Sequence, residues 1–130
     1  MALSTGLVGE ATATVTHENT AAAVGSGGVD VFATPMMIGL MEMAAAKAVQ
    51  PHLGDGETTV GTMVSVSHLA ATPRGMTVRA TARLEQADGR RLVFHVEAFD
   101  DKEKIGEGTH ERAVVQLEKF LARAGRKALS

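Results

Sequence analysis

The sequence predicts an α+β fold in which a strongly curved antiparallel β-sheet wraps around one long central helix. Two patterns lead to this expectation. Residues 34–49 carry the strongest helix signal of the chain, and the stretches after them alternate apolar and polar residues with the period of two that is typical of strands. Tight turns between these stretches favour an antiparallel meander, and its apolar face needs the helix to cover it.

Composition sets the class of protein. The chain has 130 residues, of which 45% are hydrophobic and 22% charged, as expected for a packed globular protein. We expect a single domain over residues 1–130, with a core at about 10–120 and a short C-terminal tail at 121–130. A net charge of −2 and the lack of Trp and Tyr disfavour nucleic-acid binding. The lack of cysteine excludes disulfides and a cysteine nucleophile.

The sequence gives no sign of membrane insertion or export. Residues 1–10 lack the basic and apolar regions of a signal peptide. The most apolar stretch, residues 32–46, is interrupted by Pro35, Gly39 and Glu42 and is too short to cross a bilayer. We therefore expect a cytoplasmic location and no membrane partner.

The segments before the helix differ in character. Residues 11–17 alternate as an opening strand does. Residues 20–30 are rich in Ala and Gly, with Gly25-Ser26-Gly27-Gly28 at their centre. Such a run predicts a mobile segment, which is either a simple connector or a lid over a site.

The helix has clear boundaries. Thr34 is a suitable N-cap, Pro35 fits the first helical position, and Pro51 follows the end. The helix is apolar almost all the way round, so we expect protein to wrap it on most sides.

The strands follow the helix, separated by an Asp-Gly turn and a charged turn. We expect them at residues 58–69, 76–86, 92–98 and 105–117, before a basic tail or short helix at 117–127. Within the last strand, Gly106 and Gly108 predict a bulge or a close approach of another backbone. A single sheet has exposed edges, which favours pairing between two copies of the chain.

Glu42 is the most informative residue. It is the only charged side chain between residues 32 and 46, and its helical neighbours include Ile38 and Ala45. Burying an unpaired carboxylate costs several kcal/mol, so Glu42 must be paired, protonated or in contact with a polar cavity. Each of these suits a general base or a nucleophile. The alternative is a structural carboxylate that reaches solvent or a nearby cation.

His68 and Thr34 are further candidates. His68 continues the strand face of Val64 and Val66, which we expect to point to the core, as a structural residue or as a partner of Glu42. Thr34 can cap the helix or serve a site. Eight residues of helix separate it from Glu42, a rise of about 12 Å, so the two require a spanning substrate or a second subunit to cooperate.

Other chemistry has little support. The remaining histidines are scattered and show no metal-ligand spacing, so we expect no metal: His17, His52, His95 and His110. Serine-hydrolase, P-loop and dinucleotide-binding motifs are absent from the sequence.

Three groups of residues, in this order, resemble the hot-dog-fold thioesterases, and within them most closely the fluoroacetyl-CoA thioesterase group. The likeness covers roughly residues 10–120. The groups are Phe32-Ala33-Thr34-Pro35 ahead of Glu42, then Val60-Gly61-Thr62 and Val66-Ser67-His68-Leu69-Ala70-Ala71-Thr72-Pro73, and finally Gly106-Glu107-Gly108-Thr109-His110-Glu111-Arg112.

The resemblance implies a hot-dog fold and an acyl-CoA hydrolase that acts as a homodimer, with the site between subunits and no cofactor beyond the coenzyme A of the substrate. Thr34, Glu42 and His68 would form the catalytic set. Glu42 would be the nucleophile or general base, Thr34 its hydrogen-bonding partner, and His68 the group that polarises or protonates near the thioester.

The resemblance also implies substrate-binding residues. The N–H of Gly61 would hold the carbonyl oxygen, and Arg112 would lie near the site. The group's aromatic lid is replaced here by the glycines of residues 25–28, with Phe32 as the remaining aromatic residue. We therefore expect a short acyl group other than fluoroacetyl, or a broader range.

Two alternatives stay open at this stage. A hydratase of the same fold would need an Asp-x-Asn-Pro-x-His type of motif, which is absent. A non-catalytic acyl-CoA-binding module would keep the pocket but release no thiol.

Overall fold

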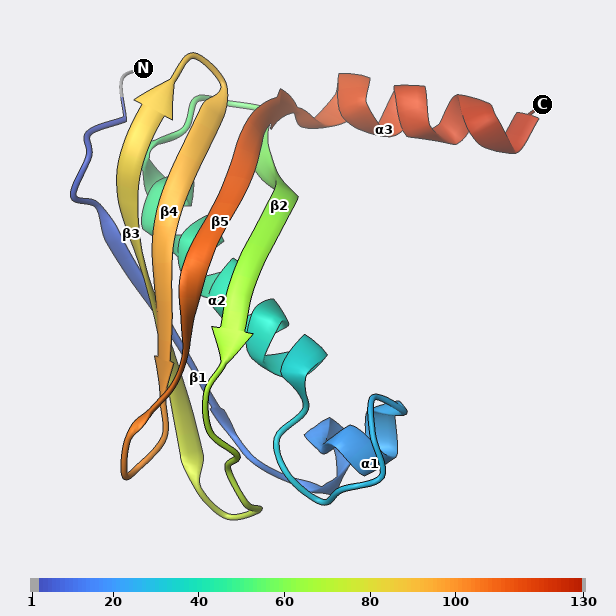
Figure 1. The fold of residues 1–130 in the computed structure, drawn as a ribbon. Helices are drawn as coiled ribbons and strands as arrows, with labels where there is room; N and C mark the ends of the chain where they lie inside the picture. The colour runs from blue at the N-terminus through green and yellow to red at the C-terminus, as the bar shows by residue number, and fades with distance from the viewer. Residues whose placement is uncertain (1–2, 130) are drawn as a thin grey trace.

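The computed structural model describes residues 3–129 (Figure 1), and its strands form one antiparallel sheet in the order β1-β3-β4-β5-β2. The strands are β1 (Val8–Thr14), β2 (Glu57–His68), β3 (Thr77–Asp88), β4 (Arg91–Phe99) and β5 (Lys104–Gln116). The helices are α1 (Ala21–Val24), α2 (Thr34–Val49) and α3 (Leu117–Gly125), with 3₁₀ turns at His17–Asn19, Gln50–His52 and Arg126–Leu129. The predicted elements are thus confirmed, with ends shifted by a few residues.

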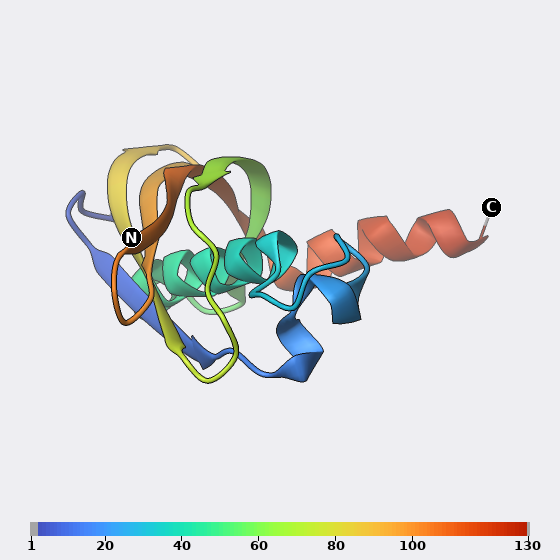
Figure 2. The same ribbon diagram turned by 60° about the horizontal axis from the view of Figure 1, so that its bottom comes forward.

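The curved sheet holds α2 against its concave face, as Figures 1 and 2 show. Met37, Met41 and Val49 of the helix are buried against the alternate apolar residues of the central strands, such as Leu84 and Phe94. Each fully buried side chain of this size contributes about 1.5–3 kcal/mol of transfer free energy. The alternation read from the sequence therefore gives the core side of β3 and β4 correctly.

One face of α2 is not covered. Met36 is 40% exposed and Met43 50%, and Gly39 between them is exposed as well. The expectation that protein wraps the helix on most sides is therefore wrong for the single chain. A sheet of five strands reaches round only one side of the helix.

The start of α2 differs from the sequence expectation. Its N-cap is Ala33, which makes no side-chain capping bond, and Pro35 lies in the first turn as predicted. Thr34 is the first helical residue, and its hydroxyl is bonded to His68 instead of to the helix backbone. Thr34 as the N-cap is therefore wrong.

A β-bulge interrupts the pairing of β2 with β5. Gly61 pairs with Arg112 and Met63 with Glu111, so Thr62 is the extra residue. A bulge changes which side chains face the core. Thr59 and Gly61 face the α2 side before it, whereas Val66 and His68 are partly buried after it. The regular alternation expected throughout the strand at residues 58–69 is wrong for this reason.

The glycines of β5 lie close to neighbouring atoms, as expected. A Cβ added at Gly108 would lie 2.6 Å from the Cα of Val66 and would also overlap the Ser65 carbonyl oxygen, both in the backbone of β2. The predicted close approach of another backbone is therefore confirmed at Gly108.

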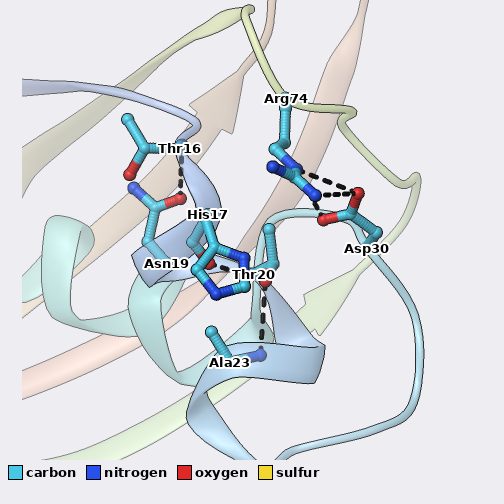
Figure 3. Close-up of polar contacts among 7 residues, drawn as sticks. All are labelled: Thr16, His17, Asn19, Thr20, Ala23, Asp30 and Arg74. Carbon is cyan, nitrogen blue, oxygen red and sulfur yellow. Dashed lines mark hydrogen bonds and ion pairs between the residues drawn. The ribbon is translucent and has the colours of Figure 1, made fainter.

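Polar contacts hold the segment between β1 and α2 against the loop after β2. Figure 3 shows Arg74, from the loop after β2, bonded to Asp30, with a nitrogen–oxygen distance of 2.7 Å. The Thr20 hydroxyl accepts from the Ala23 N–H at 3.3 Å and caps α1, and the Phe32 N–H donates to the Thr72 carbonyl at 2.8 Å. The glycine-rich tip is exposed beyond these anchors. We name residues 20–33 the β1–α2 segment.

In the part of the chain that the structure describes, no helix is both long enough and apolar enough to span a bilayer.

Candidate active site

Arg112 is the best-anchored polar side chain near the middle of α2. It lies on β5 and is buried, and its Nε and Nη2 donate to the side-chain and backbone oxygens of Thr59 at 2.8 and 2.9 Å. Burial lowers the pKa of this guanidinium, and the Glu42 carboxylate acts in the opposite sense. The group stays protonated near neutral pH because free arginine titrates above 12.

The Glu42 carboxylate faces this cation from α2. Its Oε2 lies 3.6 Å from Nη1 of Arg112, and its side chain is 42% exposed. A fixed guanidinium orients the carboxylate without enclosing it. Glu42 is therefore paired and open, not immersed in the apolar surroundings that its helical neighbours suggest.

Gly61 makes the room for this pair. A Cβ added there would lie 2.5 Å from Oε2 of Glu42, closer than real Cβ atoms approach, and 3.3 Å from the His110 ring. The lack of a side chain therefore lets the β2 backbone lie directly beside the carboxylate.

His110 completes this first cluster. Its Nδ1 is 2.8 Å from the Met63 carbonyl and its Nε2 3.2 Å from Nη1 of Arg112. A carbonyl only accepts and a guanidinium only donates, so the ring is neutral with its proton on Nδ1. Burial is the main cause that lowers the pKa of His110, in keeping with a neutral ring. His110 therefore accepts a hydrogen bond from Nη1 and fixes one side of the Arg112 guanidinium.

Thr34 and His68 form a second cluster. The Thr34 hydroxyl lies 2.7 Å from Nδ1 of His68, which links the start of α2 to the end of β2. Nε2 of His68 is buried and has no hydrogen-bond partner within residues 3–129. Burial lowers the pKa of His68. A buried ring nitrogen without a partner is available to a bound molecule.

A cleft of about 370 Å³ opens beside this second cluster. Thr34, His68 and Phe32 line it, together with Val29 and Leu69 at its edge. Its size lies in the range of small-molecule sites. Phe32 is only 2% exposed and forms part of the wall, so its expected place near a binding site agrees with the geometry.

The predicted residues thus fall into two clusters. Gly61 and Arg112 surround Glu42. Thr34 and His68 pair with each other about 12 Å away along the helix axis, at the start of α2. No hydrogen bond joins Thr34 to Glu42 within residues 3–129, as the helical rise between them leads one to expect, and Thr34 as the hydrogen-bonding partner of Glu42 stays a prediction.

Sequence reasoning missed two contributors, His110 and Thr59. His110 was set aside as one of several scattered histidines. It lies two residues before Arg112, so both side chains point to the same face of β5. That spacing was the available signal for His110. The role of Thr59 depends on the register of β2 with β5, which the sequence does not display.

Comparisons with known proteins identify the family of the chain. A family model, FlK: fluoroacetyl-CoA-specific thioesterase, matches residues 15–118. A fluoroacetyl-CoA thioesterase of Streptantibioticus cattleyicolor is 52% identical over 98 residues, which cover 75% of this chain and 70% of that protein.

Solved structures extend the likeness to the whole fold. The fluoroacetyl-CoA thioesterase FlK superimposes with a TM-score of 0.90 at 41% identity, covering 98% of both chains. A thioesterase superfamily member of Thermus thermophilus has a TM-score of 0.89 at 34% identity, covering 96% of this chain and 93% of its own.

The curved sheet around one helix, shared with these solved structures, identifies the chain as a hot-dog thioesterase. Within that class the chain belongs to the fluoroacetyl-CoA-specific thioesterase family. Across residues 3–129, no three His, Asp or Glu side chains gather in a group that could hold a metal ion.

The two site histidines should titrate below exposed ones. Because burial lowers the pKa of both His68 and His110, both rings should stay neutral until the pH falls below the ordinary histidine pKa of about 6.5. NMR titration of the ring protons should give midpoints for both rings below the ordinary histidine pKa of about 6.5. Below about pH 6.5 the unfolded chain binds more protons at these sites, so the free energy of unfolding should decrease as the pH is lowered. A midpoint above about 6.5 for either ring would contradict the burial described here.

Proposed function

We propose that this thioesterase hydrolyses short-chain acyl-CoA to the free acid and coenzyme A, with Glu42 as the central catalytic group. The observation that carries the proposal is the open Glu42 carboxylate, oriented by a buried cation and flanked by a glycine. Solved structures of FlK mutants are complexes with acetyl-CoA, and with fluoroacetate and CoA. Those ligands support an acyl-CoA substrate for a chain of the same family.

Glu42 can act in two ways. As a general base it takes a proton from water, whose oxygen attacks the thioester carbon, and the C–S bond then breaks to release the thiolate. As a nucleophile it first forms a mixed anhydride, which water then hydrolyses. Both routes need the carboxylate in the place where Arg112 holds it. In either route we assign Gly61 N–H to the developing oxyanion.

His68 has a separate role in this proposal. Its unpartnered Nε2 would donate to the thioester or to the departing sulfur when Thr34 donates to Nδ1. The Thr34 hydroxyl would thus fix the tautomer of the ring, as a positioning residue does for a catalytic histidine. His68 could then interact with the substrate while staying uncharged.

The two clusters suggest that the working protein is a homodimer. β2 lies at one edge of the sheet and is long, and Thr62, Val64, Ser65 and Ser67 on it are exposed. An exposed edge of this kind favours pairing with a second copy.

Such pairing would bring the clusters together. Two copies of β2 related by a two-fold axis run antiparallel. If the exposed run is centred on Val64, His68 of the partner subunit lies opposite residues 59–60, beyond the bulge at Thr62, next to Gly61 and therefore next to Glu42. We propose that each site takes Glu42 and Arg112 from one chain and the Thr34–His68 pair from the other.

The residues that line the cleft indicate which acyl groups it accepts. Phe32 is buried in the wall, whereas the tip at residues 25–28 carries only glycine and serine. A small-residue tip presents little surface to discriminate one small acyl group from another.

A panel of acyl-CoA substrates tests this range. We expect release of free thiol from several short acyl-CoAs, with kcat/KM values within about 200-fold of one another for acyl groups one methylene apart, because one methylene in an apolar pocket changes binding by only about 1–3 kcal/mol. A preference for fluoroacetyl-CoA of a thousandfold over acetyl-CoA would contradict the broad range.

Substitution of Glu42 tests the chemistry. Glu42→Gln keeps the size of the side chain but cannot accept a proton or attack a carbonyl, so kcat should fall by at least about a hundredfold. The matched control is Glu103→Gln in the exposed turn before β5, which should keep full activity. Circular dichroism checks that both variants fold.

Retention of full activity in Glu42→Gln would exclude the proposed role. Saturable binding of acyl-CoA by the wild-type chain without thiol release would favour the binding-module alternative.

A further inference from the structure

We propose that α3 docks on the partner subunit, where its apolar face covers the β1–α2 segment beside the partner's cleft. This inference rests on the homodimer in the proposed function and extends it. It assigns a role to the C-terminal helix, which lies outside both clusters.

The helix presents an apolar face to solvent. Every residue from Gln116 to Leu129 is exposed, and Leu121 is 57% exposed. Leu117, Phe120 and Leu121 lie three and four residues apart and therefore share one face. Exposed apolar side chains gathered on one helix face are typical of an interaction surface.

The direction of α3 points to a second copy as the occupant. Its first residue is tied to the start of β2, because the Leu117 N–H donates to the Gly56 carbonyl at 2.9 Å. From there α3 leaves the sheet and runs outward past the β2 edge, as Figures 1 and 2 both show. The helix therefore occupies the side on which we propose that a second chain pairs.

The two-fold arrangement also indicates which part of the partner α3 meets. With the pairing centred on Val64 and the bulge at Thr62 allowed for, Gly56 lies opposite residues 71–72 of the partner subunit, just after the end of its β2. In the chain described here, the loop before Thr72 includes Leu69, which is 52% exposed and lines the cleft with Val29. The first turns of α3 would thus lie against the apolar edge of the partner's cleft.

The lack of native cysteine makes this contact testable by cross-linking. One variant combines Leu121→Cys with Val29→Cys, and a second combines Leu121→Cys with Leu69→Cys. The control pair uses Ala122→Cys with Val29→Cys, because Ala122 follows Leu121 on a different side of the helix. A short bis-maleimide is added to each, and covalent dimers are counted on a denaturing gel.

We expect at least tenfold more covalent dimer from one of the Leu121 pairs than from the Ala122 pair. Equal cross-linking of both faces, or none while sedimentation shows a dimer, would overturn the docking. A monomeric chain would overturn both the docking and the shared site.

A charge substitution gives a second readout. Leu121→Lys should weaken the dimer at least tenfold in sedimentation equilibrium, whereas Ala122→Lys should leave it unchanged. Equal effects would contradict a specific apolar contact, and binding of α3 to anionic phospholipid vesicles without cross-linking would assign the face to membranes instead.

Thiol release from acetyl-CoA is measured for the wild-type chain at the same time. Activity without cross-linking in a dimeric chain overturns the docking alone. Absence of thiol release across the acyl-CoA panel overturns the proposed function, whatever α3 contacts.

Discussion

The ion pair between Glu42 and Arg112 is the interaction on which the architecture of this site depends. A buried guanidinium is costly unless its donors are satisfied, and here Thr59, His110 and Glu42 take them. The Glu42 side chain is 42% exposed, so solvent screens its attraction to Arg112 and the pair contributes little to stability. Its main effect is to fix the position of the Glu42 carboxylate beside Gly61.

The backbone of β2 is shaped around this pair. Thr62 forms a bulge, which turns Gly61 toward the helix and leaves the Met63 carbonyl to accept from His110. Because of the same bulge, His68, which lies six residues after Thr62, faces the inner side of the sheet and contacts Thr34. One irregularity in an edge strand thus serves both clusters, as bulges next to active sites often do.

The fold could be predicted from the sequence to a large extent. The period-two alternation shows which strand side chains are buried, and Pro35 and Pro51 mark the two ends of α2. Glu42 could be singled out because a lone charge in an apolar helix needs a physical reason. The family resemblance, not periodicity, pointed to Gly61 and Arg112.

Other features could not be read from the sequence. The bulge at Thr62 reverses the expected faces, and a single extra residue has no signature in an alternating run of Val, Thr and Ser. Thr34 is of a residue type that often caps helices, but its partner His68 lies 34 residues away and only the folded chain brings the two together. The ion pair of Glu42 depends in the same way on the register of β5.

The sharing of each site between two chains is the central claim of this account, and subunit complementation tests it most directly. Glu42→Gln and His68→Ala chains, each inactive alone, carry different affinity tags and are co-expressed, and the mixed dimer is purified through both tags. If each site takes its clusters from different chains, one of the two sites in the mixed dimer is intact, and thiol release should recover to about half the wild-type rate per dimer. A mixed dimer as inactive as its parents would show that both clusters of a site belong to one chain.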